Sequence, residues 1–361
     1  MTEAVQHCRW RLDWPTSAGT RVARAGLKSS PEDFQVDEVL AGFPEQSGVD
    51  VAGEGEHLCL RLQKTGDNTE FVARQLAALS GCRTFDVGYC GLKDRHAVTS
   101  QWFSLYRPGM AHSDAEFIAR VAEQWTVLSA RRHNRKLRRG EHHGNRFILT
   151  LRDVSGERAV IDEALARLKH EGAPNYFGPQ RFGFGGANLD RAAAMDSSAM
   201  DSRSRSAGRG RKGKNRAGRD ASKNVLYFSA ARSWLFNEVL AHRVADGSWL
   251  RPMDGEPGLA PGELEPTGPL WGDGGTTATG CQEQLERSVV EQAPDLVQLF
   301  STTRMKPERR SLRIRPAELA WQWQDERCLA VEFTLAPGQY ATTILSDIFE
   351  LEDMSLGRHN K

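Results

Sequence analysis

The chain has 361 residues, of which 39% are hydrophobic and 26% are charged, with a formal net charge of +1; this length and composition predict a folded protein of two compact domains. No apolar stretch approaches the roughly 20 residues that a membrane span needs, and the first residues mix acids and bases where a signal peptide has an apolar core, so we expect a cytoplasmic protein without membrane contact. Six cysteines without a Cys-x-x-Cys pair argue against a disulfide scaffold and a zinc ribbon.

Apolar periodicity predicts a strand and then a helix early in the chain. Residues 57–63 alternate apolar and polar side chains, as a half-buried strand does. Asn68 or Thr69 can cap the next helix, whose apolar residues recur at helical spacing over residues 71–79, and Gly81 can end it.

The pattern of short strands and helices continues up to residue 168. Alternation predicts strands over residues 85–90 and 102–106. Ser113 and Glu116 have the spacing of a capping box, which predicts a helix that begins there. Alternation and helical spacing likewise predict a strand over residues 147–151 and a helix over residues 161–168.

The character of the sequence changes after residue 172. A low-complexity stretch of Ser, Arg, Gly and Lys over residues 202–223 cannot bury a core, so we predict a flexible loop there. The remaining predictions are a helix from about Ser229, irregular structure over 251–276, a strand over 329–335 and a helix over 344–351. Because strands and helices mix without a βαβ rhythm, we expect an α+β fold with much antiparallel pairing.

Positive charge is concentrated in two segments. Residues 131–139 contain six Arg or Lys and no acid, and residues 203–223 contain nine basic residues and one acid. The chain without the second segment has 39 basic and 46 acidic residues, a net charge of −7. One such segment would be an ordinary solvated surface, but two of them favour a nucleic-acid partner, because binding depends on the local field.

The segment Gly91–Gln101 carries the strongest chemical signal, and it lies between two predicted strands. Asp94 stands between Lys93 and Arg95, with His96 next to them. Neighbouring cations favour the ionised carboxylate, which can act as a nucleophile or stabilise a cationic transition state. A polar turn with locally paired charges remains open as the alternative.

Two other segments have the composition of an RNA-binding site. Residues 172–183 combine glycines with aromatic rings for stacking, and their Gln180 and Arg181 can contact phosphates or base edges. Asn145 and Phe147 follow the basic run, which suits phosphates outside and a base held inside. A packed turn and a core position for Phe147 are the respective alternatives. Walker A, Rossmann and His-Glu-x-x-His motifs are absent from the sequence, so we expect no metal site.

Taken together, these segments resemble the TruD family of tRNA pseudouridine synthases. The blocks that match occur in family order over nearly the whole chain, from about Lys28 to Thr342. They are Lys28, 31–34, 91–101, 134–140, 144–147, 173–178, 180–183, 229–233 with 236–237, 337–338 and 340–342.

The resemblance implies the reaction, the partner and the fold. A uridine of tRNA, at position 13 of the D-arm, is converted to pseudouridine without a cofactor or metal, and no obligate protein partner is expected. The implied fold is α+β. Residues 1–153 and 309–361 form a pseudouridine synthase catalytic domain with a mixed, largely antiparallel sheet. Residues 154–308 form an inserted TruD-specific α+β domain, with the basic flexible loop at 202–223.

The resemblance also implies roles for individual residues. Asp94 matches the essential aspartate and Lys28 the lysine that pairs with it. Phe147 matches the aromatic residue that packs against the target base, and Phe34 and Asn145 line the same pocket. Lys93 belongs to the substrate site, where phosphate or carboxylate pairing is expected. The basic run and the second aromatic segment add RNA-contacting candidates: Arg135, Lys136, Arg138, Arg139, Gln180 and Arg181.

Two other functions compete with this interpretation. A non-catalytic RNA-binding protein or RNA chaperone would use the same basic and aromatic segments, but it has no need of Asp94, which repels phosphate. A nucleoside hydrolase usually collects several aspartates for calcium near the N-terminus, and this sequence has no such cluster.

Overall fold

The computed structural model describes residues 9–43, 48–195, 214–260, 262, 264–301, 303 and 305–355. The chain divides into two compact units. Val22–Asp162, Pro316–Ala341 and Phe349–Lys361 form the unit that we call the sheet unit. Met1–Arg21, Glu163–Arg315 and Thr342–Ile348 form the helical unit. These bounds place both 1–21 and 342–348 with the middle of the chain; the expected division into a catalytic and an inserted domain stays a prediction.

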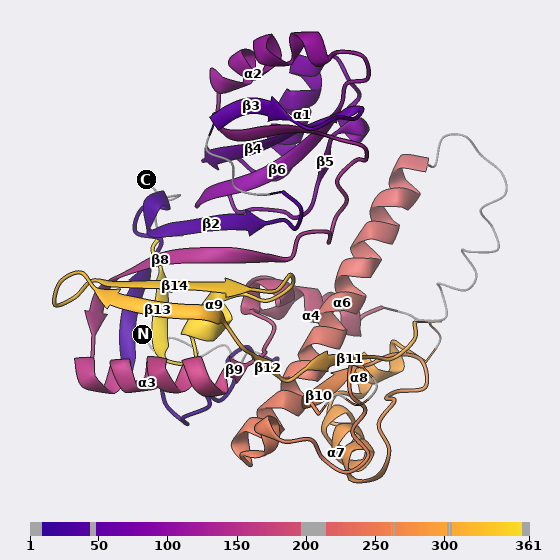
Figure 1. Ribbon diagram of the computed structural model, residues 1–361. Helices are drawn as coiled ribbons and strands as arrows, with labels where there is room; N and C mark the ends of the chain where they lie inside the picture. The colour runs from indigo at the N-terminus through magenta and orange to yellow at the C-terminus, as the bar shows by residue number, and fades with distance from the viewer. Residues whose placement is uncertain are drawn as a thin grey trace, which may run out of the picture. The chain divides into compact units, whose positions relative to one another are not determined.

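The sheet unit is built on a sheet of 11 described strands (Figure 1). Eight of them follow the order β13-β14-β8-β2-β6-β4-β7-β3; in addition, β1 pairs with β8 and β15, and β5 pairs with β6. The strands are β1 (Ala23–Leu27), β2 (Phe34–Val39), β3 (Gly48–Ala52), β4 (His57–Thr65), β5 (Gly88–Tyr89), β6 (Val98–Tyr106), β7 (Thr126–His133), β8 (Gly144–Ser155), β13 (Ala317–Trp323), β14 (Leu329–Leu335) and β15 (Phe349–Asp353).

Pairing in this sheet is mixed and largely antiparallel, as expected. Among its described strands, β1–β15, β2–β6 and β3–β7 pair in parallel, and the other seven pairings are antiparallel. Strand β2 lies between β8 and β6, so it borders both the Asn145–Phe147 segment and the strand that follows Gly91–Ala97. The pairing therefore brings two of the sequence motifs to one part of the sheet.

Two helices cover one face of β4 and β6. They are α1 (Thr69–Ser80) and α2 (Asp114–Ala122), and their apolar residues form one core with Leu58, Leu60 and Leu62 of β4. The prediction for α1 is confirmed at both ends. The Asn68 side chain accepts a hydrogen bond from the N–H of Phe71 at 2.8 Å, and Gly81 ends the helix in the left-handed conformation with φ 74°.

The helical unit is made of helices and two-stranded sheets. Its helices are α3 (Arg158–Glu171), which begins in the sheet unit, α4 (Ala187–Ala193), α6 (Lys214–Ala245), α7 (Gly280–Val290), α8 (Pro294–Gln298) and α9 (Ala341–Leu345). Its short strands are β9 (Ala173–Pro174), paired with β12 (Arg313–Ile314), and β10 (Thr267–Leu270), paired with β11 (Glu308–Ser311). Among the described residues, no helix is both long and apolar enough to span a membrane.

Short 3₁₀ helices occur in both units. They are Pro31–Asp33, Thr84–Asp86, Ala111–Ser113, Pro179–Phe182, Phe184–Gly186 and Ser248–Leu250. One of them corrects the predicted strand over residues 85–90, because Phe85 lies in the 3₁₀ turn and only Gly88 and Tyr89 pair with β6. An ion pair of 2.9 Å between Arg83 and Asp86 closes that turn.

The predicted capping box at Ser113 is wrong, although the helix is present. The Ser113 hydroxyl donates to the carbonyl of Met110 at 3.0 Å and accepts from the Arg107 guanidinium at 3.1 Å. It therefore makes no capping hydrogen bond to α2.

Two other predicted elements, the helix over 344–351 and the helix from about Ser229, differ from the structure. The predicted helix over 344–351 is a short helix, α9, followed by strand β15, because Phe349–Asp353 pairs in parallel with β1. Helix α6 begins at Lys214 rather than near Ser229, so residues 214–223 of the predicted loop are helical. Residues 202–213 of that loop lie outside the described part of the chain.

Candidate active site

The loop between β5 and β6 presents the Asp94 carboxylate to solvent. One oxygen, Oδ2, accepts from the ammonium of Lys28 at 2.7 Å. The other, Oδ1, accepts from the backbone N–H of His96 at 3.0 Å. The Asp94 side chain is nevertheless 39% exposed, so it keeps access to a ligand.

Lys28 follows β1 directly and has a left-handed backbone, with φ 61°. This conformation is unfavourable for a long side chain, and the surrounding structure has to hold it. The carbonyl of Leu27 accepts from the N–H of Met354 at 2.9 Å, which fixes the backbone just before Lys28. The Lys28 side chain is only 8% exposed and also lies 3.8 Å from Oδ2 of Asp353. A buried cation is thus aimed at a half-exposed carboxylate.

The local electrostatics keep Asp94 ionised. Partial burial of the carboxyl group favours the neutral acid and opposes ionisation. The hydrogen bond from His96 and the hydrogen bond and charge of Lys28 outweigh burial, so the pKa of Asp94 lies below its usual range. The side chain is therefore an anion at neutral pH.

An aromatic cluster adjoins the ion pair. The Lys28 ammonium lies 4.7 Å from the centre of the Phe34 ring. Phe34 packs edge-on against Phe147 at 6.2 Å, and Phe147 packs against Phe333 at 5.6 Å. A continuous series of contacts therefore joins Asp94 to Phe147. The Phe147 ring is only 7% exposed, so it also belongs to the core of the sheet unit.

Asn145 lies two residues before Phe147 on β8 and therefore on the same face of the sheet. In register it lies opposite Glu38 of β2 and Leu335 of β14. Its side-chain oxygen is buried and has no hydrogen-bond partner among the described residues. Such a group usually has a partner, so this oxygen is a buried acceptor that the described part of the protein does not itself use.

Lys93 lies next to Asp94 in sequence but pairs with a different carboxylate. Its ammonium is 2.8 Å from Oε2 of Glu38, and the two side chains are 5% and 0% exposed. The second oxygen of Glu38 accepts from the N–H of Trp102 at 3.3 Å. Of the two kinds of partner expected for Lys93, the structure has the carboxylate; a direct contact of Lys93 with substrate stays a prediction.

The loop that carries Asp94 is anchored on α1 and β6. The N–H of Lys93 donates to the hydroxyl of Thr69 at 2.9 Å, and this hydroxyl donates to the side chain of Gln101 at 2.9 Å. Gln101 donates in turn to the carbonyl of Gly91 at 2.5 Å. These hydrogen bonds hold the backbone at Gly91 and Lys93, directly before Asp94, and so help to position the carboxylate.

Three of the six RNA-contacting candidates, Arg135, Arg138 and Arg139, are exposed residues of the sheet unit. Arg138 and Arg139 are exposed on the segment between β7 and β8, whereas Lys136 is partly buried. Arg135 pairs with Glu141. Gln180 and Arg181 belong to the helical unit, where the Arg181 guanidinium lies 5.3 Å from the Phe177 ring. Their contact with RNA stays a prediction.

Two carboxylates of this region, Glu38 and Asp353, are missing from the sequence predictions. A signal was present for Glu38, because it follows Phe34 and Val36 at alternate positions and therefore lies on the buried face of β2. A buried acid at such a position requires a cation partner. Asp353 gave no signal, because its approach to Lys28 depends on the pairing of β15 with β1. Among the described residues, no group of three His, Cys, Asp or Glu is arranged to hold a metal.

Comparison with known proteins gives the family. The family model described as "tRNA pseudouridine synthase D (TruD)" matches residues 17–188 and 258–348, more than half of the chain. The chain belongs to the TruD family. This is a family of isomerases, and the basic stretch at residues 202–223 lies between the two matched segments.

Individual relatives agree with the TruD assignment over nearly the whole chain. A tRNA pseudouridine synthase D of Marinobacter nauticus is 59% identical over 358 residues, covering 98% of this chain and 99% of that protein. One from Xanthomonas euvesicatoria pv. vesicatoria is 40% identical, covering 96% of each chain. A crystal structure described as a TruD protein from Methanosarcina mazei has the same fold, with a TM-score of 0.61, 20% identity and coverage of 93% and 95%.

Proposed function

We propose that this chain converts uridine 13 in the D-arm of tRNA to pseudouridine, with Asp94 as the catalytic residue. The observation that carries the proposal is the half-exposed, ionised Asp94 carboxylate held by the buried ammonium of Lys28 at 2.7 Å, in a chain of the TruD family.

The reaction is an isomerisation in which atoms balance within one nucleoside. The bond from C1′ to N1 breaks, the uracil rotates, and a bond from C1′ to C5 forms. The proton on C5 leaves, and N1 gains one. Because positive charge develops at C1′ when the glycosidic bond breaks, an ionised carboxylate there lowers the barrier. Asp94 acts either by attack on C1′ or by removal of a C2′ proton.

The surroundings of Asp94 support the handling of a detached base. The uridine has to leave its stack in the tRNA to reach the carboxylate. The Phe34–Phe147 pair, which is largely buried beside Lys28, would offer the base an apolar contact at the edge of the site. The unpartnered oxygen of Asn145 can accept from N3–H of uracil, which distinguishes uridine from cytidine because cytosine carries no hydrogen at N3. These contacts would hold the base while it turns.

Site mapping tests the proposal directly. Purified protein is incubated with an unmodified tRNA transcript, and pseudouridine is located by chemical derivatisation and primer extension. We expect one new pseudouridine, at position 13, and none in a matched transcript with cytidine at that position. Pseudouridine at another position would overturn the choice of target. Tight tRNA binding without any pseudouridine would favour the non-catalytic RNA-binding alternative.

A further inference from the structure

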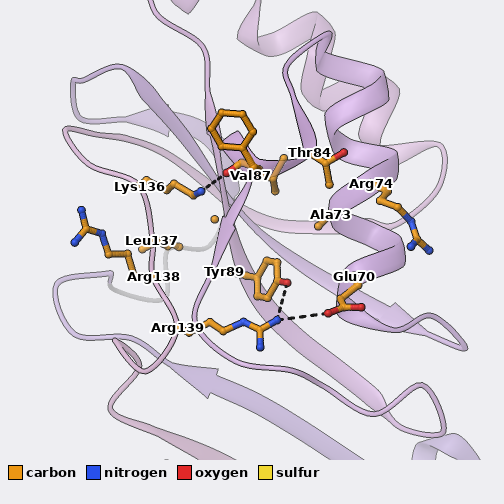
Figure 2. A pocket seen from close by; sticks show the side chains of 12 residues that line it. Glu70, Ala73, Arg74, Thr84, Val87, Tyr89, Lys136, Leu137, Arg138 and Arg139 are labelled. Atoms are coloured by element: carbon orange, nitrogen blue, oxygen red, sulfur yellow. Dashed lines mark hydrogen bonds and ion pairs between the residues drawn. The ribbon is translucent and has the colours of Figure 1, made fainter. Parts of the chain in front are cut away.

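A basic groove lies in the sheet unit between helix α1 and residues 136–139 (Figure 2). Its volume is about 770 Å³. Helix α1 contributes Glu70, Ala73 and Arg74 to one side. The opposite side and the floor are lined by Thr84, Phe85, Val87, Gly88, Tyr89, Lys136, Leu137, Arg138 and Arg139.

The groove carries a surplus of positive charge. Its lining has four cationic residues and a single acid, Glu70. The guanidinium groups of Arg74 and Arg138 are exposed, and within the described part of the chain neither has a hydrogen-bond or ion-pair partner. Arg139 donates to the Tyr89 hydroxyl at 3.1 Å and lies 3.5 Å from Glu70. Charges left without protein partners on both sides of a groove suit a polyanion.

Aromatic rings lie among these cations. Phe85 is 61% exposed, and the Arg83 guanidinium lies 4.1 Å from the centre of its ring. The Lys136 ammonium lies 6.0 Å from the same ring, and Arg139 lies 5.4 Å from the ring of Tyr89. A positively charged groove that contains an exposed aromatic side chain, here Phe85, can bind single-stranded nucleic acid, because a base can stack on the ring while cations contact the phosphates.

The backbone ties this groove to the catalytic loop. Residues 136–137 pass close to Gly88 among the residues that line the groove. The approach is so close that a Cβ atom at position 88 would lie 2.3 Å from the carbonyl oxygen of Leu137, so only glycine fits there. The N–H of Gly140 donates to the carbonyl of Cys90 at 2.9 Å, one residue before the loop begins. Tyr89 precedes Asp94 by five residues, so their backbones are at most about 18 Å apart. A separation of this size between the groove and Asp94 can be spanned by nucleotides that neighbour the reacting one.

We propose that the groove binds an unpaired nucleotide of the RNA substrate, close in the strand to the target uridine. The base stacks on Phe85, and the adjoining phosphates contact Arg74 and Arg138. This inference rests on the proposed function for the identity of the RNA, but the binding that it describes requires no catalysis.

Binding of a short fluorescein-labelled oligouridine, followed by fluorescence anisotropy, tests the groove without chemistry. Phe85→Ala is expected to weaken binding by about tenfold, which corresponds to about 1.4 kcal/mol, and Phe85→Tyr to retain most of the affinity. Arg138→Glu and Arg74→Glu should weaken binding at low salt. Each should also reduce the slope of log affinity against log salt by about 0.7 for every phosphate that the variant no longer binds.

Arg120→Glu is the matched control. Arg120 is an exposed arginine of helix α2 that does not line the groove, so the same charge reversal should leave affinity within about twofold. Equal decreases in affinity for Arg120→Glu and Arg138→Glu, or wild-type affinity for Phe85→Ala, would overturn the inference.

The two proposals can fail separately. If Phe85→Ala loses oligouridine binding but the wild-type protein makes no pseudouridine, the groove is supported and the proposed function is contradicted. If the protein makes pseudouridine at position 13 but Phe85→Ala and Arg138→Glu leave KM unchanged, the proposed function is supported and the groove is contradicted. Melting curves on each variant should match wild type, because these side chains are exposed.

Discussion

The sheet unit contains two lysine–carboxylate pairs of nearly the same length in different surroundings. Lys28 and Asp94 are 2.7 Å apart, and Lys93 and Glu38 are 2.8 Å apart. In the first pair the carboxylate is 39% exposed, whereas in the second both side chains are buried. The two loop members, Lys93 and Asp94, are adjacent in sequence and point to different partners.

We interpret the difference as that between a pair that can react and a pair that holds the loop. A carboxylate that is held by a cation and still reaches solvent can act on a ligand, whereas a pair whose two side chains are both buried holds its segment in place. Lys93 therefore anchors the loop through Glu38 so that Asp94 can face outward. If this comparison is right, changes in one pair should affect turnover and changes in the other should affect folding.

The largest expected effect is loss of turnover in Asp94→Asn. The amide keeps the shape and removes the charge, so pseudouridine formation should fall by at least about three orders of magnitude. Because Asp94 is partly exposed and Asp353 stays 3.8 Å from the Lys28 ammonium, the free energy of unfolding should fall by less than it does in Glu38→Gln, and tRNA binding should stay within about tenfold. Turnover within a factor of ten of wild type would remove Asp94 as the essential group.

Glu38→Gln should act mainly on stability. It leaves the buried Lys93 ammonium without its carboxylate partner, which should lower the free energy of unfolding by about 3–5 kcal/mol in urea denaturation. The double variant Glu38→Gln, Lys93→Met removes both charges and should recover much of this loss. A single variant as stable as wild type, or a double variant no better than the single one, would contradict a structural role for this pair.

Lys28→Met should change the pH dependence of turnover. With Lys28 present, the pKa of Asp94 is below its usual range, so the active anion persists as pH falls until pH reaches that lowered pKa. Without Lys28, burial of Asp94 is opposed mainly by the hydrogen bond from His96, so the acid limb of kcat/KM should move to higher pH. Asp353→Asn is the control, since Asp353 lies 3.8 Å from Lys28 and does not touch Asp94 in any described hydrogen bond. An acid limb that stays in place in Lys28→Met would show that Lys28 does not set the charge state of Asp94.

Local sequence signals predicted the elements that depend on local contacts. Helix α1 has its cap at Asn68 and its stop at Gly81, both within hydrogen-bond reach of the helix itself. The predicted helix over 344–351 failed because the same apolar spacing also serves a strand once β1 lies beside it. The predicted strand over 85–90 is shorter than expected because Thr84–Asp86 form a 3₁₀ turn closed by the Arg83–Asp86 ion pair, which leaves only Gly88 and Tyr89 paired with β6.

The same distinction applies to the site. The cations around Asp94 in the sequence predicted an ionised carboxylate, and the lowered pKa of Asp94 agrees, but the groups that hold it are the N–H of His96 and the ammonium of Lys28, 66 residues away. Lys28 was found through the resemblance to the family, since nothing in its local sequence points to Asp94. Glu38 and Asp353 could not be paired with their lysines without the strand register.

The parallel pairing of β1 with β15 also affects the timing of assembly. Leu27, just before Lys28, lies in register with Asp353, so the strand that positions the cation has an open edge until residue 353 has been made. At about 5–20 residues per second, the roughly 200 residues between β8 and β15 take about 10–40 s to synthesise. During translation we therefore expect one edge of β1 to stay unpaired, with the Lys28–Asp94 ion pair completed only after β15 has been synthesised.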